Sequence, residues 1–192
     1  MFKITGSGPY CAVSYDSSTF ADLLFYMSEM GLHLTRQDPD DFLQVQPTST
    51  TQYINLVTKF PLRHKICQHL DNNSLNRFSF FGSYIPKLEN INNGVFIYPG
   101  VNIYPSAKIQ SDVIIHSGSS IAHKATIGQG TYISGHVVIA GNTAVGKYCW
   151  IGLDVSILDK IYIADHVTIN SRALVIKSIE NQHTIYSKHI KR

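Results

Sequence analysis

Three histidines lie close together in the second half of the chain, and they are the side chains best suited to chemistry. They are His116, His123 and His136. An imidazole titrates near neutral pH, so it can take a proton from a reacting group and return it later. His123 follows Ile121 by two residues, and its ring is expected to project outward if Ile121 points into a core. All three histidines are therefore candidates for a general base, the alternative being surface histidines without a catalytic role.

The cysteines, the possible metal ligands and the net charge do not point to a particular chemistry. The three cysteines, Cys11, Cys67 and Cys149, are an odd number without a CxxC pair or metal-site spacing, and we expect free thiols in a reducing compartment. Paired metal ligands are absent at useful spacing, so no metal is expected. The formal charge of +3, from 16 basic and 13 acidic residues, is too small to indicate nucleic-acid binding.

The composition predicts a folded protein that does not enter a membrane. Apolar residues make up 44% of the chain and charged residues 15%, which is sufficient for a substantial core. The chain has no run of 18 apolar residues, and its first 16 residues lack the uninterrupted apolar segment of a secretion signal. We therefore expect a cytoplasmic protein.

The three histidines lie within a repeat of six residues. Ile or Val recurs at every sixth position from Ile85 to Val175, sixteen times without a slip, although only 35 of the 192 residues are Ile or Val. A period of six fits neither an α-helix nor a single long strand. It fits a short strand followed by a corner, with three such hexads in each 18-residue coil. Residues 85–176 are therefore predicted to form a parallel β-helix of about five coils.

Residues 1–84 show a different pattern. Strand-like stretches at residues 11–15, 53–57 and 78–84 alternate with helical stretches at residues 20–30 and 61–70. Strand–helix alternation over this length predicts a small parallel α/β unit. Residues 35–52 are polar and are expected to form an exposed loop, and residues 177–192 are expected to form a C-terminal tail.

The hexad pattern resembles the left-handed β-helix of the hexapeptide-repeat acyltransferases, and the likeness is strongest over residues 115–158. The resemblance implies that the β-helix is left-handed, whereas the six-residue spacing does not determine handedness. A small α/β unit before the helix resembles one branch of that family, the acetyltransferases of sialic-acid, bacillosamine and perosamine type sugars. In that branch the N-terminal unit holds the nucleotide sugar, the β-helix holds acetyl-CoA, and a homotrimer forms active sites between neighbouring helices. The chain looks like a divergent member.

The resemblance assigns roles to individual residues. His123 aligns with the catalytic histidine, but Lys124 stands where the family usually has a carboxylate. Gly141 and Leu153 match residues at the thioester arm of acetyl-CoA. Three further positions depart from the family and are still expected to contact the cofactor: Tyr132 in place of a histidine, Ser171 in place of a Gly-rich turn, and Lys188 in the basic tail, near the 3′-phosphate.

The predicted substrate site lies at the first strand–helix junction. Asp16, Ser17, Ser18 and Thr19 replace the family's Gly-rich turn, and their hydroxyl groups and amides could bind a phosphate or a ribose. Four exposed aromatic residues are expected to cover a trimer contact or to stack on a base: Tyr98, Tyr104, Tyr148 and Trp150.

These features and the resemblance together predict an acyl-CoA-dependent acyltransferase, with His123 as base. The expected reaction is N-acetylation of an amino group on a nucleotide-linked sugar for surface glycan synthesis. One alternative is an O-acyltransferase, or a transferase of longer acyl groups, acting on a non-nucleotide sugar. Another is a non-catalytic trimeric binding or scaffold protein, because the carboxylate after His123, the Gly-rich turn and the family's C-terminal motif are all missing.

Overall fold

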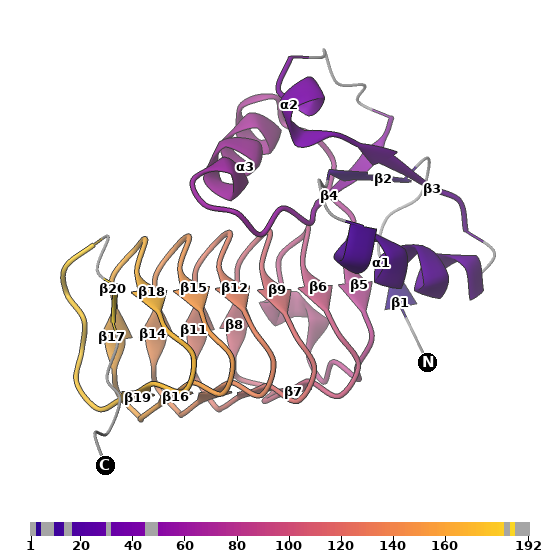
Figure 1. Ribbon diagram of the computed structural model, residues 1–192. Helices are drawn as coiled ribbons and strands as arrows, with labels where there is room; N and C mark the ends of the chain where they lie inside the picture. Colours follow the sequence, from indigo (N-terminus) through magenta and orange to yellow (C-terminus); the bar gives the residue numbers. More distant parts are fainter. Residues whose placement is uncertain are drawn as a thin grey trace. The chain divides into compact units, whose positions relative to one another are not determined.

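The computed structural model describes residues 3–4, 10–13, 17–29, 32–44, 50–182 and 185–186. The chain divides into two compact units, residues 2–79 and residues 80–192 (Figure 1). The first holds a small parallel sheet with helices, and the second is a parallel β-helix. The predicted fold class is therefore confirmed. Among the described residues, none of the helices has the length and apolar character needed to cross a bilayer.

The first unit is organised around a three-stranded parallel sheet. Strand β2 (Tyr10–Val13) lies between β3 (Leu34–Gln37) and β4 (Gln52–Asn55), and Cys11 is opposite both Thr35 and Tyr53. The remaining elements of this unit are β1 (Lys3–Ile4), α1 (Ser17–Glu29), α2 (Pro39–Phe42) and α3 (Leu62–Asn72). Because β2 is central, the chain leaves it toward one edge and later returns to pair with its other side.

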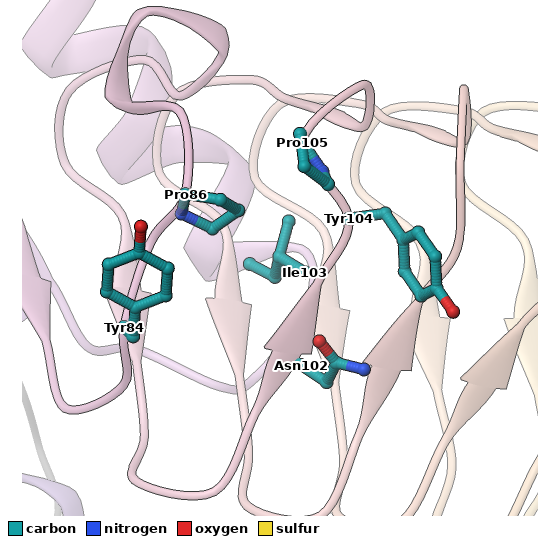
Figure 2. Close-up of a pocket in the computed structure, with 6 residues that line it drawn as sticks. All are labelled: Tyr84, Pro86, Asn102, Ile103, Tyr104 and Pro105. Atoms are coloured by element: carbon teal, nitrogen blue, oxygen red, sulfur yellow. The ribbon is translucent and has the colours of Figure 1, made fainter.

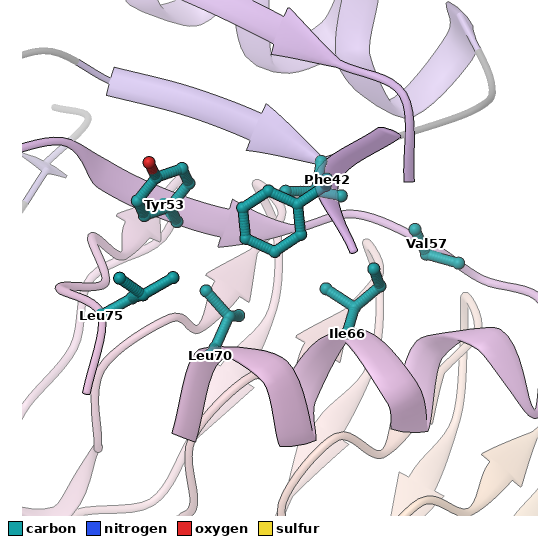
Figure 3. Close-up of a cluster of buried hydrophobic side chains, with 7 residues drawn as sticks. Phe42, Tyr53, Val57, Ile66, Leu70 and Leu75 are labelled. Carbon is teal, nitrogen blue, oxygen red and sulfur yellow. The ribbon is translucent and has the colours of Figure 1, made fainter. Parts of the chain in front are cut away.

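One buried cluster holds this unit together (Figure 3). Ile66 and Leu70 are four residues apart on α3, so they lie on the same face of the helix and point toward the Phe42 ring. The Phe42 and Tyr53 ring centroids are 5.2 Å apart. The complete cluster comprises Val13, Phe42, Tyr53, Val57, Ile66, Leu70 and Leu75.

The loop expected over residues 35–52 is wrong in its first part. Residues 34–37 form β3 and residues 39–42 form α2. Asp38 caps α2, because its Oδ1 accepts a hydrogen bond of 2.9 Å from the amide of Asp40, and Pro39 occupies the first turn. The Asp38-Pro39 pair is thus a sequence signal for the start of a helix, although the stretch is polar.

The β-helix is built from two-residue strands in three parallel sheets. Within this unit, the strands of sheet I are β5 (Phe80–Phe81), β6 (Phe96–Ile97), β9 (Ile114–Ile115), β12 (Tyr132–Ile133), β15 (Trp150–Ile151), β18 (Thr168–Ile169) and β20 (Ile185–Tyr186). Sheet II contains β7 (Asn102–Ile103), β10 (Ser120–Ile121), β13 (Val138–Ile139), β16 (Ser156–Ile157) and β19 (Leu174–Val175). Sheet III contains β8 (Lys108–Ile109), β11 (Thr126–Ile127), β14 (Ala144–Val145) and β17 (Tyr162–Ile163).

The pairing register follows the 18-residue coil. Ile121 pairs with Ile103 on one side and with Ile139 on the other. Every hexad residue from Ile97 to Val175 is buried, with at most 4% of its surface exposed. Removing these aliphatic side chains from water stabilises the stack by roughly 1.5–3 kcal/mol each, before the cost of ordering the chain.

The two ends of the β-helix differ from the simple repeat. Ile85 and Ile91 are only half-buried, and a 3-10 turn, η1 (Leu88–Asn90), separates them. Phe81 takes the strand position that pairs with Ile97, sixteen residues on. At the other end Ile179 bridges Ile163, and β20 pairs with β18, so the ladder extends into the segment that was expected to be a tail.

Candidate active site

His123 lies at a corner of the β-helix, between β10 of sheet II and β11 of sheet III, and its side chain is exposed. The chain turns at Lys124, which has a left-handed φ of 56° and whose amide donates a hydrogen bond of 3.1 Å to Ser106 Oγ. Since Ile121 is fully buried two residues earlier, the imidazole projects away from the core. The structure thus places His123 on the outside, as its position in the hexad predicts.

Gly141 occupies the same corner one coil later and contacts the His123 ring. A Cβ atom at Gly141 would collide with Cε1 and Nε2 of that ring, so a glycine is required for the imidazole to lie against the backbone. The amide of Asn142 donates a hydrogen bond of 2.9 Å to the His123 carbonyl oxygen, which fixes the two corners together. The structure therefore brings together two of the predicted site residues.

Three backbone amides at the hexad position of Gly141 have a side-chain acceptor. Those amides donate to a side-chain oxygen of a neighbouring coil: Gln129 to Gln110, Lys147 to Asp165, and Leu153 to Ser171, at 3.1, 2.7 and 3.2 Å. Within the described part of the chain, the Gly141 amide has no such acceptor. Asp159, one coil further, instead lies 3.7 Å from the Lys160 ammonium group. A donor beside an exposed imidazole is suited to holding a developing negative charge on oxygen.

A pocket lies beside this corner. The Tyr104 ring meets the His123 ring edge-on, with centroids 6.4 Å apart and an interplanar angle of 70°. Tyr104 also lines a pocket of about 320 Å³, shown in Figure 2. The lining residues are Tyr84, Pro86, Asn102, Ile103, Tyr104 and Pro105, and we call this cavity the tyrosine pocket. Sequence reasoning missed it, because it had considered Tyr104 only as a packing or base-stacking residue.

The alternative base His116 lies on a different face. It belongs to sheet I, where its Nε2 atom is hydrogen-bonded to the Tyr132 hydroxyl at 2.9 Å and its ring stacks on Tyr98 at 4.2 Å. Tyr132 in turn stacks on Trp150, with centroids 6.4 Å apart. The predicted cofactor residue Tyr132 is thus on the sheet I face, and the structure does not bring it to the His123 corner.

The other predicted residues of the repeat lie at the corner between sheets I and II. Leu153 and Ser171 share that corner, joined by the hydrogen bond given above, and Leu153 is exposed. The second alternative base, His136, lies there too, with its ring packed over Gly118. In one copy of the chain, the structure therefore separates Leu153 and Ser171 from His123 and Gly141 by the width of sheet II.

The substrate residues predicted in the first unit are only partly described. Ser17, Ser18 and Thr19 are the first residues of α1, but their side chains, together with Asp16 and Lys188, lie outside the described residues. The central strand β2 ends at Val13, shortly before α1 begins. In open parallel sheets, ligands bind beyond the carboxyl ends of strands where the strand order reverses, and β2 is such a strand.

A buried polar cluster lies at the end of the neighbouring strand and was not foreseen. Arg63 is fully buried, and its Nη1 atom donates to the carbonyl oxygens of Asn55 and Val57 at 3.0 and 2.9 Å. The Asn55 side chain donates to the Arg63 carbonyl oxygen and accepts from the Val57 amide. These contacts fix the backbone after β4.

The two cysteines whose side chains the structure describes are not placed for chemistry. Burial raises the pKa of the Cys149 thiol from its ordinary value of 9.0 to about 12, so this thiol stays protonated and inert. Cys67 is also buried. The described residues contain no group of three or more His, Cys, Asp or Glu side chains that could hold a metal ion.

Comparison with known families identifies the repeat. Residues 106–141 match the family described as bacterial transferase hexapeptide (six repeats). Residues 106–141 of the β-helix are therefore similar to this family's repeats. The matched segment contains both His123 and Gly141, so it includes the corner described above.

Curated relatives match the same kind of segment. UDP-3-O-acylglucosamine N-acyltransferase from Janthinobacterium sp. (strain Marseille) is 42% identical over 57 residues, which are 30% of this chain and 16% of the relative. The enzyme of that name from Herminiimonas arsenicoxydans is 41% identical over 58 residues, 30% of this chain and 17% of the relative. The matches thus span about a sixth of the length of these relatives.

Solved structures match nearly the whole chain. The acetyltransferase domain of PglB from Neisseria gonorrhoeae FA1090 superposes with a TM-score of 0.76 at 12% identity, over 90% of this chain and 93% of that one. WeeI from Acinetobacter baumannii AYE gives 0.71 at 13% identity, over 91% and 94%. A mutant of perosamine N-acetyltransferase from Caulobacter crescentus, in complex with CoA and GDP-perosamine, gives 0.63 at 11% identity, over 93% and 92%. The α/β unit followed by a β-helix is therefore a fold that these three proteins share with the chain.

Proposed function

We propose that this chain is an acyl-CoA-dependent sugar acyltransferase that acetylates an amino group of a nucleotide-linked sugar. The observation that carries the proposal is the corner where the exposed His123 imidazole lies against Gly141, beside a pocket. Two solved relatives of the fold support the choice of substrates. PglB from N. gonorrhoeae has been solved with acetyl coenzyme A, and the C. crescentus enzyme with CoA and GDP-perosamine.

The corner supplies the two groups that acyl transfer requires. The His123 imidazole takes the proton from the sugar amine as the nitrogen attacks the thioester carbonyl carbon. The Gly141 amide donates a hydrogen bond to the oxyanion that forms. When the carbon–sulfur bond breaks, the imidazolium returns the proton to the leaving thiolate. The products are the N-acetylated sugar and free CoA.

Acetyl-CoA as co-substrate requires more surface than one corner provides. Leu153 and Ser171, the proposed donor contacts, lie at a different corner from His123 and Gly141 in the same copy. A single acetyl-CoA molecule can contact both pairs of residues if the Leu153 corner of one copy faces the His123 corner of the next. We propose a homotrimer with its active sites between neighbouring β-helices. The face between the two corners supports this arrangement because it exposes apolar side chains: Val138, Leu158, Leu174 and Ile176.

Two further residues, Lys188 and Tyr132, are proposed to contact acetyl-CoA. Lys188 would meet the 3′-phosphate of CoA, since an ammonium group favours phosphate oxygens. Tyr132 is placed on the sheet I face, where its hydroxyl is bonded to His116. For Tyr132 to contact the donor, the pantetheine arm must pass over sheet I of one of the copies.

The α/β unit is the proposed holder of the nucleotide. Asp16, Ser17, Ser18 and Thr19 follow the central strand β2 and lead into α1. The first amides of a helix bind phosphate groups well, because they lack intrahelical partners and lie at the positive end of the helix dipole. The cytoplasm, where acetyl-CoA and nucleotide sugars are made, is the proposed location.

Lys124 requires a different way to orient the base. A lysine cannot accept the imidazole N–H bond that a carboxylate would accept. In this chain the His123 ring is instead held by contact with Gly141 and by a T-shaped contact with the Tyr104 ring. Packing thus takes over an orienting role that the family usually gives to a hydrogen bond.

Calorimetry combined with turnover tests this function. Titration of the full chain with acetyl-CoA, then with UDP-, dTDP-, GDP- and CMP-linked amino sugars, should give micromolar binding of acetyl-CoA and of one sugar class. Formation of the acetylated sugar should follow. Absence of acetyl-CoA binding would contradict the proposal and favour a scaffold protein, whereas acetyl-CoA binding with no response to any of the four nucleotide sugars would favour a non-nucleotide acceptor.

A further inference from the structure

We propose that the tyrosine pocket beside His123 binds the pyranose ring of the acceptor, by stacking the C–H face of the ring between Tyr84 and Tyr104. This inference rests on the proposed function, and it adds the position and the recognition chemistry of the sugar. It assigns a binding role to Tyr84 and Asn102, which the sequence did not single out, and to Tyr104, which was expected to pack against a partner or to stack on a base.

The pocket brings together two tyrosines from different segments of the β-helix. Tyr84 follows β5, and Tyr104 follows β7. In Figure 2 the two rings stand on opposite sides of the opening, with the Asn102 amide between them and Pro86 and Pro105 above. The exposed fractions of Tyr84 and Tyr104 are 84% and 46%. Two large rings left exposed across one cavity form a surface that a ligand can cover.

The chemistry of the lining favours a sugar ring over a phosphate. The six residues that line the pocket are uncharged: two tyrosines, two prolines, one isoleucine and one asparagine. A phosphate group needs cations or clustered amide donors. A pyranose ring instead presents C–H groups on one face and hydroxyl groups around its rim. Aromatic and proline rings cover the C–H groups, while the Asn102 amide and the tyrosine hydroxyls can bond the rim.

The size and position of the pocket fit the same ligand. A cavity of about 320 Å³ is at the small end of the range for ligand sites, so it suits a monosaccharide and not a complete nucleotide sugar. Because Tyr104 both lines the pocket and contacts His123, a ring stacked on Tyr104 presents its substituents to the imidazole. The nucleotide part would then extend away from the pocket.

The test compares Tyr84→Ala with a matched control. Tyr162 on β17 of sheet III is also an exposed tyrosine and does not line the pocket, so Tyr162→Ala serves as the control. Saturation-transfer NMR on the full chain would use methyl glycosides of 2-amino and 4-amino pyranoses, which carry no nucleotide. Wild type and Tyr162→Ala should give signals on the ring C–H protons. In Tyr84→Ala these signals should weaken about fivefold, consistent with loss of one aromatic contact.

Turnover provides a second readout. Tyr84→Ala should raise KM for the sugar about fivefold, while KM for acetyl-CoA and kcat stay within about twofold of wild type. Tyr104→Ala should raise the sugar KM and also lower kcat, because Tyr104 contacts His123, and Tyr104→Phe should restore both because it keeps the ring.

The outcomes separate this inference from the proposed function. Acetyl transfer that proceeds with an unchanged sugar KM in Tyr84→Ala would overturn the pocket assignment and leave the function standing. If the chain transfers no acetyl group, the function fails, and the NMR experiment still decides the pocket. Equal NMR signals in wild type and Tyr84→Ala, or no signals in wild type, would overturn the pocket assignment.

Discussion

Two regions of the β-helix each pair a histidine with a tyrosine, but to different effect. On the outer face of sheet I, His116 is hydrogen-bonded to the Tyr132 hydroxyl and stacks on Tyr98. At the corner between sheets II and III, His123 is exposed, lies against Gly141 and makes only a T-shaped contact with the Tyr104 ring among the aromatic contacts described.

The difference follows from the position of each histidine in its hexad. His116 directly follows the inward Ile115, so it extends a strand and lies beside equivalent residues of the coils above and below. His123 is one residue further from its inward Ile121, at the turn, where neighbouring side chains diverge. A strand position thus favours packing, and a corner position leaves an imidazole accessible.

The largest expected effect distinguishes the two histidines by activity. His123→Ala should lower turnover at least a hundredfold, because it removes the general base. His116→Ala should lower turnover less than about threefold, because His116 lies on another face. Steady-state rates of acetyl transfer at saturating substrates measure both. If turnover fell more in His116→Ala than in His123→Ala, His116 and not His123 would be the general base.

The second prediction concerns the contact that holds His123. Gly141→Ala should lower kcat about tenfold or more, because its Cβ displaces the imidazole from the position it occupies. Gly135→Ala is the matched control, since its Cβ would lie 3.4 Å from Leu153 Cδ1, an ordinary contact. Thermal unfolding followed by circular dichroism should show that both variants fold. Full activity in Gly141→Ala would mean that the contact does not position the base.

The third prediction uses a buried group of the β-helix as a contrast to the exposed corner. The folded-state pKa of Cys149 is raised to about 12 from 9.0. Above pH 9 the unfolded thiol loses its proton while the folded thiol keeps it, so the free energy of unfolding falls by about 1.4 kcal/mol per pH unit between these values. More than about one pH unit below 9 this group contributes almost no pH dependence.

Urea denaturation at pH 8, 9 and 10 measures this slope. Cys149→Ala should reduce the decrease between pH 9 and 10 by about 1 kcal/mol relative to wild type, since the unfolded thiol is already half ionised at pH 9 and the other titrating groups are common to both proteins. An identical pH dependence in the two proteins would show that the thiol is not held protonated by burial.

The smallest expected effect tests the structural role of the sheet I pair. Tyr132→Phe removes the hydroxyl that is bonded to His116 and should lower the free energy of unfolding by about 1 kcal/mol. Tyr162→Phe removes the hydroxyl of an exposed tyrosine and should change it by less than about 0.5 kcal/mol. Equal effects in urea denaturation would argue that the His116–Tyr132 bond adds nothing to stability.

The repeat was predictable because one residue in six carries the signal. The inward Ile and Val residues repeat at a fixed spacing, and each pairs with its equivalent 18 residues on. That spacing also implies that Gly141 follows His123 at the same corner. The same spacing places Leu153, twelve residues after Gly141, at another corner. The family resemblance named both residues as cofactor contacts without indicating this separation.

The parts that were missed depend on local irregularities. Strand β3 and helix α2 occupy a polar stretch in which a single Asp-Pro cap outweighs the composition. The tyrosine pocket depends on the first coil, where Phe81 pairs sixteen and not eighteen residues from Ile97. A strict hexad places Tyr84 just before an inward residue and gives no indication that it faces Tyr104 across a cavity.

A crystal structure of the chain soaked with acetyl-CoA would test the central claim most directly. The account predicts that the thioester carbonyl oxygen lies about 3 Å from the Gly141 amide, beside the His123 ring, with the rest of the donor crossing to the Leu153 corner of a neighbouring copy. A thioester bound on the sheet I face, out of reach of His123, would contradict the assignment of this corner as the active site.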